Sequence, residues 1–255
     1  MVQFDFTGKV VLVTGASRGI GKATAKMFAQ ADASVIVHFN KNKELAQAVL
    51  DDLTGDNHTL FAANLSNPDE VQNLVDFVAQ KYGRIDVLVN NAGVFEEFDV
   101  LDLDYESWQK TWHKTIGTNL TGVANLSFLV AKLMKDKGGC RIVNVSSRGA
   151  FRGEPDAPAY GASKAGLNSL GQSMARAFAK LKIYVFTVAP GFVDTDMAAS
   201  AMIGDRAEDI RTQSPLNRIS DPDEIAQTIC FLASEGHDYM TGCIVDINGA
   251  SYLRT

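Results

Sequence analysis

The chain has 255 residues, of which 46% are hydrophobic and 21% are charged, and its formal net charge is −6. This composition is typical of a folded globular protein and excludes a disordered or fibrous chain. The acidic balance, with 24 basic against 30 acidic residues, lacks the positive footprint of a nucleic-acid binder, and no apolar run is long enough to span a bilayer.

The N-terminal residues and the cysteines indicate the cellular compartment in which the protein works. The opening residues MVQFDFTGK carry an acid where a secretory signal peptide needs a basic region, and the apolar run that follows is short. The three cysteines, Cys140, Cys230 and Cys243, form no C-x-x-C pair, which favours a reducing compartment over a disulfide framework or zinc ribbon. The four histidines have no metal-binding spacing either. We therefore expect a cytoplasmic protein without a metal site or a membrane partner.

Short apolar, β-branched runs recur along the chain and predict its strands. They are near-continuous rather than alternating, which is typical of strands buried on both faces of a parallel sheet. The runs are residues 10–13, 35–37, 59–62, 85–89, 142–145, 183–188 and 244–247.

Stretches with helical spacing separate these strands. Asn67-Pro68-Asp69-Glu70 begins one with a capping side chain, a first-turn proline and two acids, and residues 221–224 repeat the signal. The alternation predicts an α/β fold: a doubly wound, Rossmann-type parallel sheet of about seven strands with helices on both faces. No linker or repeat interrupts it, so a single domain over residues 1–255 is expected.

A glycine-rich turn, TGASRGIG at residues 14–21, follows the first strand and leads into a helix. Such a turn forms an anion site, because free backbone N–H groups and the positive end of the helix dipole face the ligand. The spacing is G-x-x-x-G-x-G rather than G-x-G-x-x-G, and the G-K-[ST] of nucleotide triphosphatases is missing. A tight connection without a ligand is the alternative, but the position after the first strand favours a dinucleotide.

The end of the second strand indicates which dinucleotide binds. An NAD site usually has an acid there for the ribose 2′-hydroxyl. Here Phe39 takes that position, Asn40 and Lys41 follow, and Arg18 lies in the glycine turn. Two cations without a carboxylate favour NADP(H) over NAD(H); the alternative is that Arg18 and Lys41 are solvated surface charges.

Tyr160 and Lys164 lie four residues apart at the start of a predicted helix and so share a face. An ammonium close to a phenol lowers the phenol pKa, and such a tyrosine can exchange a proton with a substrate hydroxyl or carbonyl. Ser147, at the end of the fifth strand, could hydrogen-bond the same oxygen. The alternative is a tyrosine that only packs, beside a solvated lysine. The presence of Ser147 and of the glycine turn favours the catalytic interpretation.

Together these motifs resemble the short-chain dehydrogenase/reductase superfamily, and within it the β-ketoacyl-acyl-carrier-protein reductase-like group. The resemblance covers essentially the whole chain and includes Asn90-Asn91-Ala92-Gly93 and Pro190-Gly191. It implies that Tyr160 is the acid/base and that Lys164 is its partner and a ligand of the nicotinamide ribose. It further implies that Ser147 holds the substrate oxygen and that Asn119 anchors a proton relay to Lys164.

The resemblance also implies an NADP(H) site that extends over several loops. Asn64-Leu65 takes the place of the family's Asp-Val/Leu pair beside the adenine ring, and Asn64 lacks the negative charge of the family's aspartate. By the same resemblance, the segment from Pro190 to Thr195 binds the nicotinamide carboxamide. The expected cofactor-binding residues are Gly15, Ser17, Arg18, Gly19, Ile20, Gly21, Asn40, Lys41, Asn64, Leu65, Asn91, Ala92, Gly93, Tyr160, Lys164, Pro190, Gly191, Val193 and Thr195. We expect the cofactor site mainly in residues 8–120 and the substrate site mainly in residues 145–215.

Two segments near the expected substrate site stand out. Arg148 and Arg152 either bind an anionic or polyhydroxylated substrate or form ion pairs with Glu154 or Asp156. Residues 197–209, rich in alanine and methionine, are interpreted as a mobile segment that covers the substrate.

The sequence therefore predicts an NADPH-dependent oxidoreductase that reversibly reduces a carbonyl to a secondary alcohol, with a 3-oxoacyl thioester as the best substrate hypothesis. The alternatives are a sugar, polyol or other alcohol dehydrogenase, and a non-catalytic NADP(H)-binding regulator, which would not need the complete set of four catalytic residues. By resemblance, a homotetramer or homodimer is expected. An acidic carrier protein that presents the substrate would need exposed cations near the entrance, for which Lys135, Lys137, Lys180 and Lys182 are candidates.

Overall fold

The computed structural model describes residues 4–254, with the side chains of Ser200, Ala201 and Asp205 left undescribed. Seven parallel strands form one sheet in the order β3-β2-β1-β4-β5-β6-β7. The strands are β1 (Val10–Val13), β2 (Ser34–Phe39), β3 (Thr59–Ala62), β4 (Val87–Asn90), β5 (Cys140–Val145), β6 (Ile183–Pro190) and β7 (Ile244–Ile247). Every predicted strand is confirmed, with ends that shift by a residue or two.

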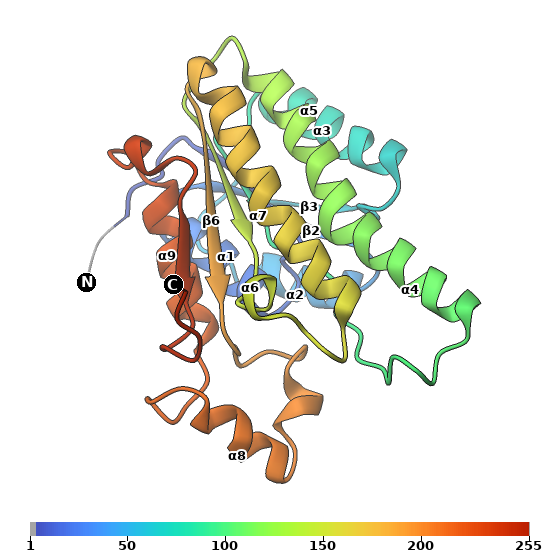
Figure 1. Ribbon diagram of the computed structural model, residues 1–255. Coiled ribbons are helices and arrows are strands. Elements are labelled where there is room, and N and C mark those ends of the chain that lie inside the picture. The colour runs from blue at the N-terminus through green and yellow to red at the C-terminus, as the bar shows by residue number, and fades with distance from the viewer. Residues whose placement is uncertain (1–3, 255) are drawn as a thin grey trace.

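The helices of the described chain alternate with these strands and cover the sheet (Figure 1). They are α1 (Gly19–Gln30), α2 (Lys43–Asp51), α3 (Pro68–Tyr82), α4 (Tyr105–Ile116), α5 (Gly122–Met134), α6 (Gly149–Arg152), α7 (Pro158–Phe178), α8 (Asp205–Thr212) and α9 (Pro222–Ala233). None of them is long and apolar enough to cross a membrane.

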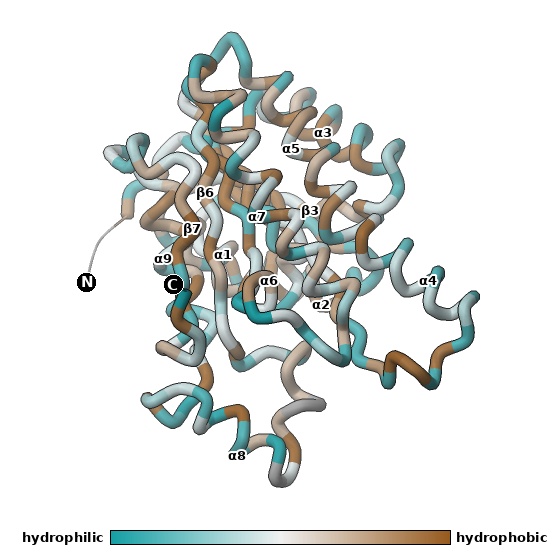
Figure 2. Tube along the Cα trace, viewed as in Figure 1, coloured by the Kyte–Doolittle hydropathy of each residue, from teal (hydrophilic) through white to brown (hydrophobic). Residues whose placement is uncertain are grey.

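Strand β1 shows why the sheet is covered on both faces. Its side chains alternate, so Val11 and Val13 join one apolar cluster with Phe28 of α1, while Leu12 joins another with Leu74 of α3. All these side chains are buried, and each contributes about 2 kcal/mol through removal from water. The doubly wound architecture follows from this two-sided burial, and in Figure 2 hydrophobic residues mark much of β6 and β7.

The predicted helix starts are confirmed. The Asn67 side chain accepts a hydrogen bond from the Asp69 N–H at 3.0 Å. Asp221 forms a complete capping box with Glu224 at the start of α9. Each cap stabilises its helix by about 1 kcal/mol, because it satisfies donors that have no partner inside the helix.

The parallel strands bring the motif residues to one edge. The glycine turn follows β1, residues 91–93 follow β4, Ser147 follows β5, and Gly191 follows β6. In Figure 1 the arrow of β6 points towards α8, which lies beyond this edge. Open α/β sheets bind ligands at the carboxyl ends of their strands.

Candidate active site

The glycine turn is closely packed, and α1 begins inside it at Gly19. A Cβ atom at Gly21 would lie 2.3 Å from the Gly15 carbonyl oxygen, so no other residue fits there. The Asn91 side-chain amide donates to the carbonyl oxygens of Thr14 at 2.9 Å and Gly15 at 3.1 Å. The side chain of Asn91 therefore fixes the shape of the turn.

His38, at the end of β2, also holds this turn. Its Nδ1 accepts a hydrogen bond from the Gly15 N–H at 3.1 Å, and its Nε2 lies 2.9 Å from the Ala63 carbonyl oxygen. Because Nδ1 accepts, these partners assign the proton of the neutral ring to Nε2. Burial lowers the pKa of His38 to about 4. The histidine is thus a core residue that holds the glycine turn.

Lys164 lies at the centre of the candidate site. Its side chain is buried, and its Nζ donates to the Val145 carbonyl oxygen at 2.8 Å. The same nitrogen lies 5.6 Å from the centre of the Tyr160 ring. A Cβ atom at Gly93 would lie 3.5 Å from this nitrogen and 3.4 Å from Oδ1 of Asn119. The residues that the sequence analysis singled out in β4, α4–α5 and α7 therefore converge.

Asn119 lies in a π-helical turn, Gly117–Thr121, between α4 and α5. Such turns are frequent at functional sites. Its Oδ1 accepts from the Val94 N–H at 2.8 Å, and its Nδ2 donates to the Val94 carbonyl oxygen at 3.0 Å and to Ser163 Oγ at 3.1 Å. Ser163 Oγ in turn donates to the Tyr160 carbonyl oxygen at 2.7 Å. Asn119 thus joins the loop after β4 to the first turn of α7.

The ionisation of Tyr160 differs from the expectation. Burial raises the pKa of Tyr160 to about 12, the Glu154 carboxylate adds to this, and a side-chain hydrogen bond with Ser147 opposes it. Burial lowers the pKa of Lys164 to about 8. The expectation that Lys164 lowers the pKa of Tyr160 is wrong for this structure, because desolvation of the phenol outweighs a lysine that is itself desolvated and bonded to Val145.

The segment after β6 lies against the glycine turn. A Cβ atom at Gly19 would lie 2.9 Å from Cγ2 of Thr195, and the Gly191 N–H donates to the Ile247 carbonyl oxygen at 3.0 Å. Arg18 forms an exposed ion pair with Asp196 at 3.4 Å. The segment after β6 therefore packs directly against the glycine turn. A glycine-rich turn at a helix N-terminus suits the phosphates of a dinucleotide.

The other expected cofactor residues follow neighbouring strands at the same edge. Asn40 and Lys41 follow β2 and are exposed. Asn64 follows β3, where its Oδ1 accepts from the backbone N–H and the hydroxyl of Ser66 at 3.1 and 2.8 Å. Leu65 beside it is buried. The amide oxygen of Asn64 is therefore used within its own loop.

Known proteins resemble this chain over nearly its whole length. A family model described as enoyl-(acyl carrier protein) reductase matches residues 15–250. The chain is 38% identical over 249 residues to the 3-oxoacyl-[acyl-carrier-protein] reductase of Vibrio cholerae, which covers 98% of this chain and 99% of the relative. This protein belongs to the short-chain dehydrogenase/reductase superfamily.

Two solved structures of this superfamily are similar over nearly their full lengths. A short-chain dehydrogenase from Burkholderia cenocepacia in complex with NADP is 33% identical with a TM-score of 0.88, covering 96% of this chain and 98% of the other. A glucose/ribitol dehydrogenase-type short-chain dehydrogenase/reductase from Brucella melitensis is 30% identical with a TM-score of 0.91, covering 99% and 100%. This short-chain dehydrogenase/reductase is an NAD(P)-dependent oxidoreductase.

Arg148 and Arg152, in the segment after Ser147, have different partners in the structure. Arg152 forms an ion pair with Glu154 at 3.2 Å, the structural alternative. Arg148 is buried, and within the described residues its guanidinium has no carboxylate within 4 Å. The two arginines therefore have different roles in this dehydrogenase/reductase.

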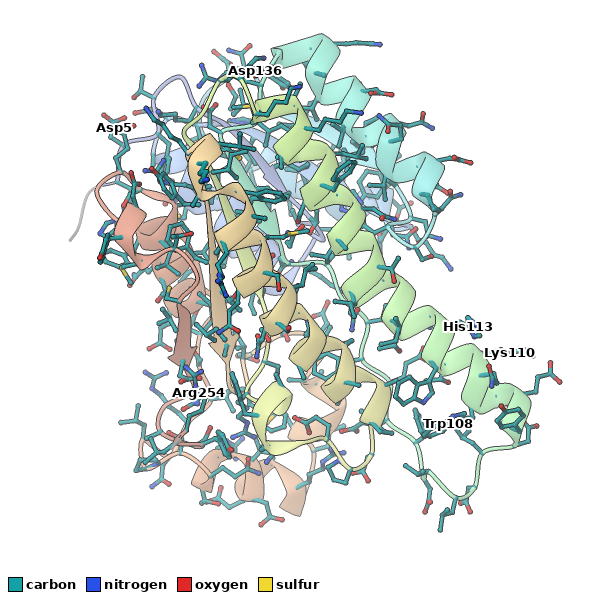
Figure 3. The ribbon with its side chains drawn as sticks, turned by 45° about the horizontal axis from the view of Figure 1, so that its top comes forward. Asp5, Trp108, Lys110, His113, Asp136 and Arg254 are labelled. Carbon is teal, nitrogen blue, oxygen red and sulfur yellow. The ribbon has the colours of Figure 1, made fainter. Side chains whose placement is uncertain are left out.

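The lysines suggested for carrier-protein docking lie at the wrong end of the molecule. Lys135 and Lys137 follow α5, and Lys180 and Lys182 follow α7, so all four lie where β5 and β6 begin. Asp136, labelled in Figure 3, marks this end, opposite the carboxyl edge with the candidate site. Because these lysines directly precede two strands of a parallel sheet, they lie at the amino edge of that sheet.

Aromatic side chains border Tyr160 on the α4 side. The Phe95 ring meets the Tyr160 ring edge-on with 4.9 Å between centres, and Trp108 of α4, labelled in Figure 3, packs against Phe98 and Trp112. The two tryptophans therefore pack against neighbouring aromatic rings. Phe95, Ser163 and His38 are the site residues that the sequence analysis missed; only Ser163, one helical turn after Tyr160, carried a signal in its spacing.

Proposed function

We propose that this protein is an NADPH-dependent reductase that converts a carbonyl to a secondary alcohol, reversibly. The observation that carries the proposal is the convergence of Lys164 on both the Tyr160 ring and the Asn119 side chain, beside Gly93. A non-catalytic regulator that only holds a dinucleotide would not require a buried lysine beside a half-buried tyrosine.

The residues of the site have separate roles in this proposal. Tyr160, with its pKa raised to about 12, carries its proton at neutral pH and donates it to the substrate oxygen as negative charge develops there. Ser147 donates a hydrogen bond to the same oxygen. Lys164, with one hydrogen bond to Val145, retains two N–H groups for the ribose hydroxyls of the cofactor. Bound NADPH would supply the hydride.

Asn119 positions these groups, because its amide joins the loop at Val94 to Ser163 in α7. The catalytic set is therefore Asn119, Ser147, Tyr160 and Lys164. We assign the cofactor mainly to residues 8–120 and the substrate mainly to residues 145–215, within one domain.

The preference for NADP(H) over NAD(H) rests on Arg18 and Lys41 and on the lack of an acid at the end of β2. Arg18 pairs with Asp196 through side chains that are 62% and 66% exposed. An exposed pair of this kind contributes about 1 kcal/mol or less, so a 2′-phosphate would compete for Arg18 without a large cost.

Two classes of carbonyl substrate are supported by different observations. A 3-oxoacyl thioester is supported by the similarity to the 3-oxoacyl-[acyl-carrier-protein] reductases. A free keto-sugar or other small ketone is favoured by a different observation. Residues 94–106, from the loop after β4 into the first turn of α4, contain six acids and no base, and an acidic carrier protein would be repelled there.

We further propose a homotetramer or homodimer that binds neither nucleic acid nor membrane. The three cysteines are free, and no metal-ligating cluster occurs among the described residues. Free cysteines support a reducing compartment, the cytoplasm.

The test is a screen that follows NADPH oxidation with acetoacetyl thioesters, keto-sugars, diketones and quinones, with Tyr160→Phe as the matched variant. We expect one class to give turnover, at least about 100-fold slower in the variant, with NADPH affinity nearly unchanged because only the acid is removed. Equal turnover in the variant would refute the role of Tyr160. Turnover that is faster with NADH would refute the cofactor assignment.

A further inference from the structure

A cavity of about 80 Å³ lies apart from the Tyr160–Lys164 cluster, between the end of β7 and the chain from α8 to α9. Its wall includes Arg148, Phe192, Ser214, Arg218, Asn248 and Ser251. None of the proposed catalytic or cofactor-binding residues lines it. The cavity therefore calls for an account of its own, which does not rest on the proposed function.

Arg148 is the charge in this wall that forms no ion pair within 4 Å among the described residues. The residue is only 3% exposed, yet its guanidinium donates to the Gln213 side-chain oxygen and stacks over the Phe192 ring, 5.0 Å from its centre, rather than meeting a carboxylate. Burial and the repulsion from Arg152 lower the pKa of Arg148 to about 10, against the attraction of the Glu154 carboxylate, so it is charged at neutral pH. A buried charge without a direct ion pair is costly.

Arg218, the second cation in the cavity wall, is paired with a carboxylate. Arg218 donates two hydrogen bonds of 2.7 Å to the Glu224 carboxylate, which also accepts from the Ser220 hydroxyl and the Asp221 N–H. Glu224 is thus fully used and does not serve Arg148. Among the described residues, the cavity has one unpaired positive charge and no unpaired negative charge.

Ser251 adds a hydrogen-bonding group to the same wall. Its hydroxyl oxygen is buried and has no hydrogen-bond partner. Buried hydroxyls nearly always have one, since an unsatisfied group costs about 1–3 kcal/mol. A volume of 80 Å³ exceeds the space of two water molecules, each about 30 Å³, and accommodates a small tetrahedral or planar anion.

We propose that this cavity binds a small oxyanion, a phosphate, sulfate or carboxylate, through the guanidinium of Arg148 and the hydroxyl of Ser251. The ligand supplies the missing negative charge. Arg148 directly follows Ser147 and contacts Gln213 just after α8, so a bound anion also ties the segment that carries α8 to the end of β5. The chemistry is shared by free inorganic anions and by small metabolites with a carboxylate, which the experiment separates.

The experiment is calorimetric titration of the full chain with inorganic phosphate, sulfate or acetate at constant ionic strength. It uses the Arg18→Met/Lys41→Met background, which lacks the two cations proposed for the cofactor 2′-phosphate. Any anion binding to the backbone of the glycine turn persists in this background, but it would not respond to substitutions at Arg148 or Ser251, so the result does not depend on the proposed function. Arg148→Met and Ser251→Ala are the test variants. Arg152→Met is the matched control, because it removes the same charge from an arginine that is already paired with Glu154.

We expect saturable one-to-one binding that Arg148→Met weakens by about tenfold or more and Ser251→Ala by a few fold, while Arg152→Met leaves it unchanged. Tighter binding of phosphate and sulfate than of acetate assigns the site to inorganic or phosphorylated ligands, and the reverse order assigns it to carboxylates. No saturable heat with any anion, which would mean that water fills the cavity, overturns the proposal. Equal affinities in the Arg148→Met and Arg152→Met variants also overturn it. If Arg148→Met fails to fold, an unchanged anion affinity in Ser251→Ala overturns the proposal instead.

Discussion

Arg206 and Glu97 join the two walls of the entrance to the candidate site. The Arg206 guanidinium donates to both Glu97 carboxylate oxygens, at 3.0 and 2.5 Å. Arg206 belongs to α8, beyond the carboxyl edge of the sheet, and Glu97 to the loop between β4 and α4, next to Phe95 and Tyr160. This hydrogen bonding raises the pKa of Arg206. The pair therefore holds α8 over the site.

Replacement of Arg206 by methionine breaks this connection. We expect a three- to tenfold rise in KM with the identified substrate, because α8 then samples more open positions. The free energy of unfolding should change by less than about 1 kcal/mol, because both side chains are partly exposed. Arg211→Met is the control, since Arg211 pairs with Glu208 inside α8 itself. Equal KM values in the two variants would contradict a role for the pair across the entrance.

Acidification should destabilise the fold through His38. The folded-state pKa of about 4 lies below the ordinary value of 6.5, so the unfolded chain takes up the proton first as the pH falls. The stability from neutral His38 is complete above pH 6.5 and is lost as the pH falls towards 4, by on the order of 3 kcal/mol.

Denaturant unfolding between pH 4 and 7 checks this prediction. His38→Gln should show a shallower loss of stability with falling pH than the parent protein. His58→Gln is the control, because His58 also bonds to backbone groups, Val35 and Thr54, but is less buried. Parallel pH profiles for His38→Gln and the parent protein would rule out the histidine as the source.

A single methyl group at Gly21 should weaken dinucleotide binding. The added Cβ would press on the Gly15 carbonyl and on the Asn91 amide at 2.6 Å, so the turn must shift. We expect NADPH affinity, measured by fluorescence titration, to fall at least about tenfold, with about 1–3 kcal/mol of stability lost. Gly83→Ala at the end of α3 has free space for its Cβ but a φ of +74°, and it should lose stability without losing affinity. Affinity loss in both variants would mean that instability alone explains the effect.

Glu154 should set the pH dependence of the proposed acid/base. Its carboxylate raises the pKa of Tyr160, so Glu154→Gln should lower that pKa and move the pH profile of alcohol oxidation, which needs the phenolate, to lower pH. Arg152→Met should move the profile to higher pH, because it removes the cation that partly neutralises Glu154. The measurement is kcat/KM against pH for the three proteins. Shifts in the same direction in both variants would refute this electrostatic account.

The fold was predictable because its signals are local. Each buried strand of a parallel sheet is a short apolar run, and caps such as Asn67 mark where helices begin. The sequence position of Tyr160 relative to Lys164 likewise predicts a shared helix face. These features depend on residues within a few positions of one another.

The features that escaped prediction depend on contacts distant in the sequence. Arg148 meets Gln213 rather than a nearby acid, and His38 bonds to Gly15 across two strands. The raised pKa of Tyr160 comes from burial among elements that only the tertiary structure assembles.

The hydrogen bonds of Asn119 have a consequence for the entropy of ligand binding. Its amide already satisfies the loop at Val94 and the hydroxyl of Ser163, so these segments are ordered when the chain folds. Ordering a residue costs about 1–2 kcal/mol, and here folding bears that cost rather than the ligand. A dinucleotide and a substrate that enter therefore meet a preorganised frame, and their binding free energy remains available to align the reacting atoms.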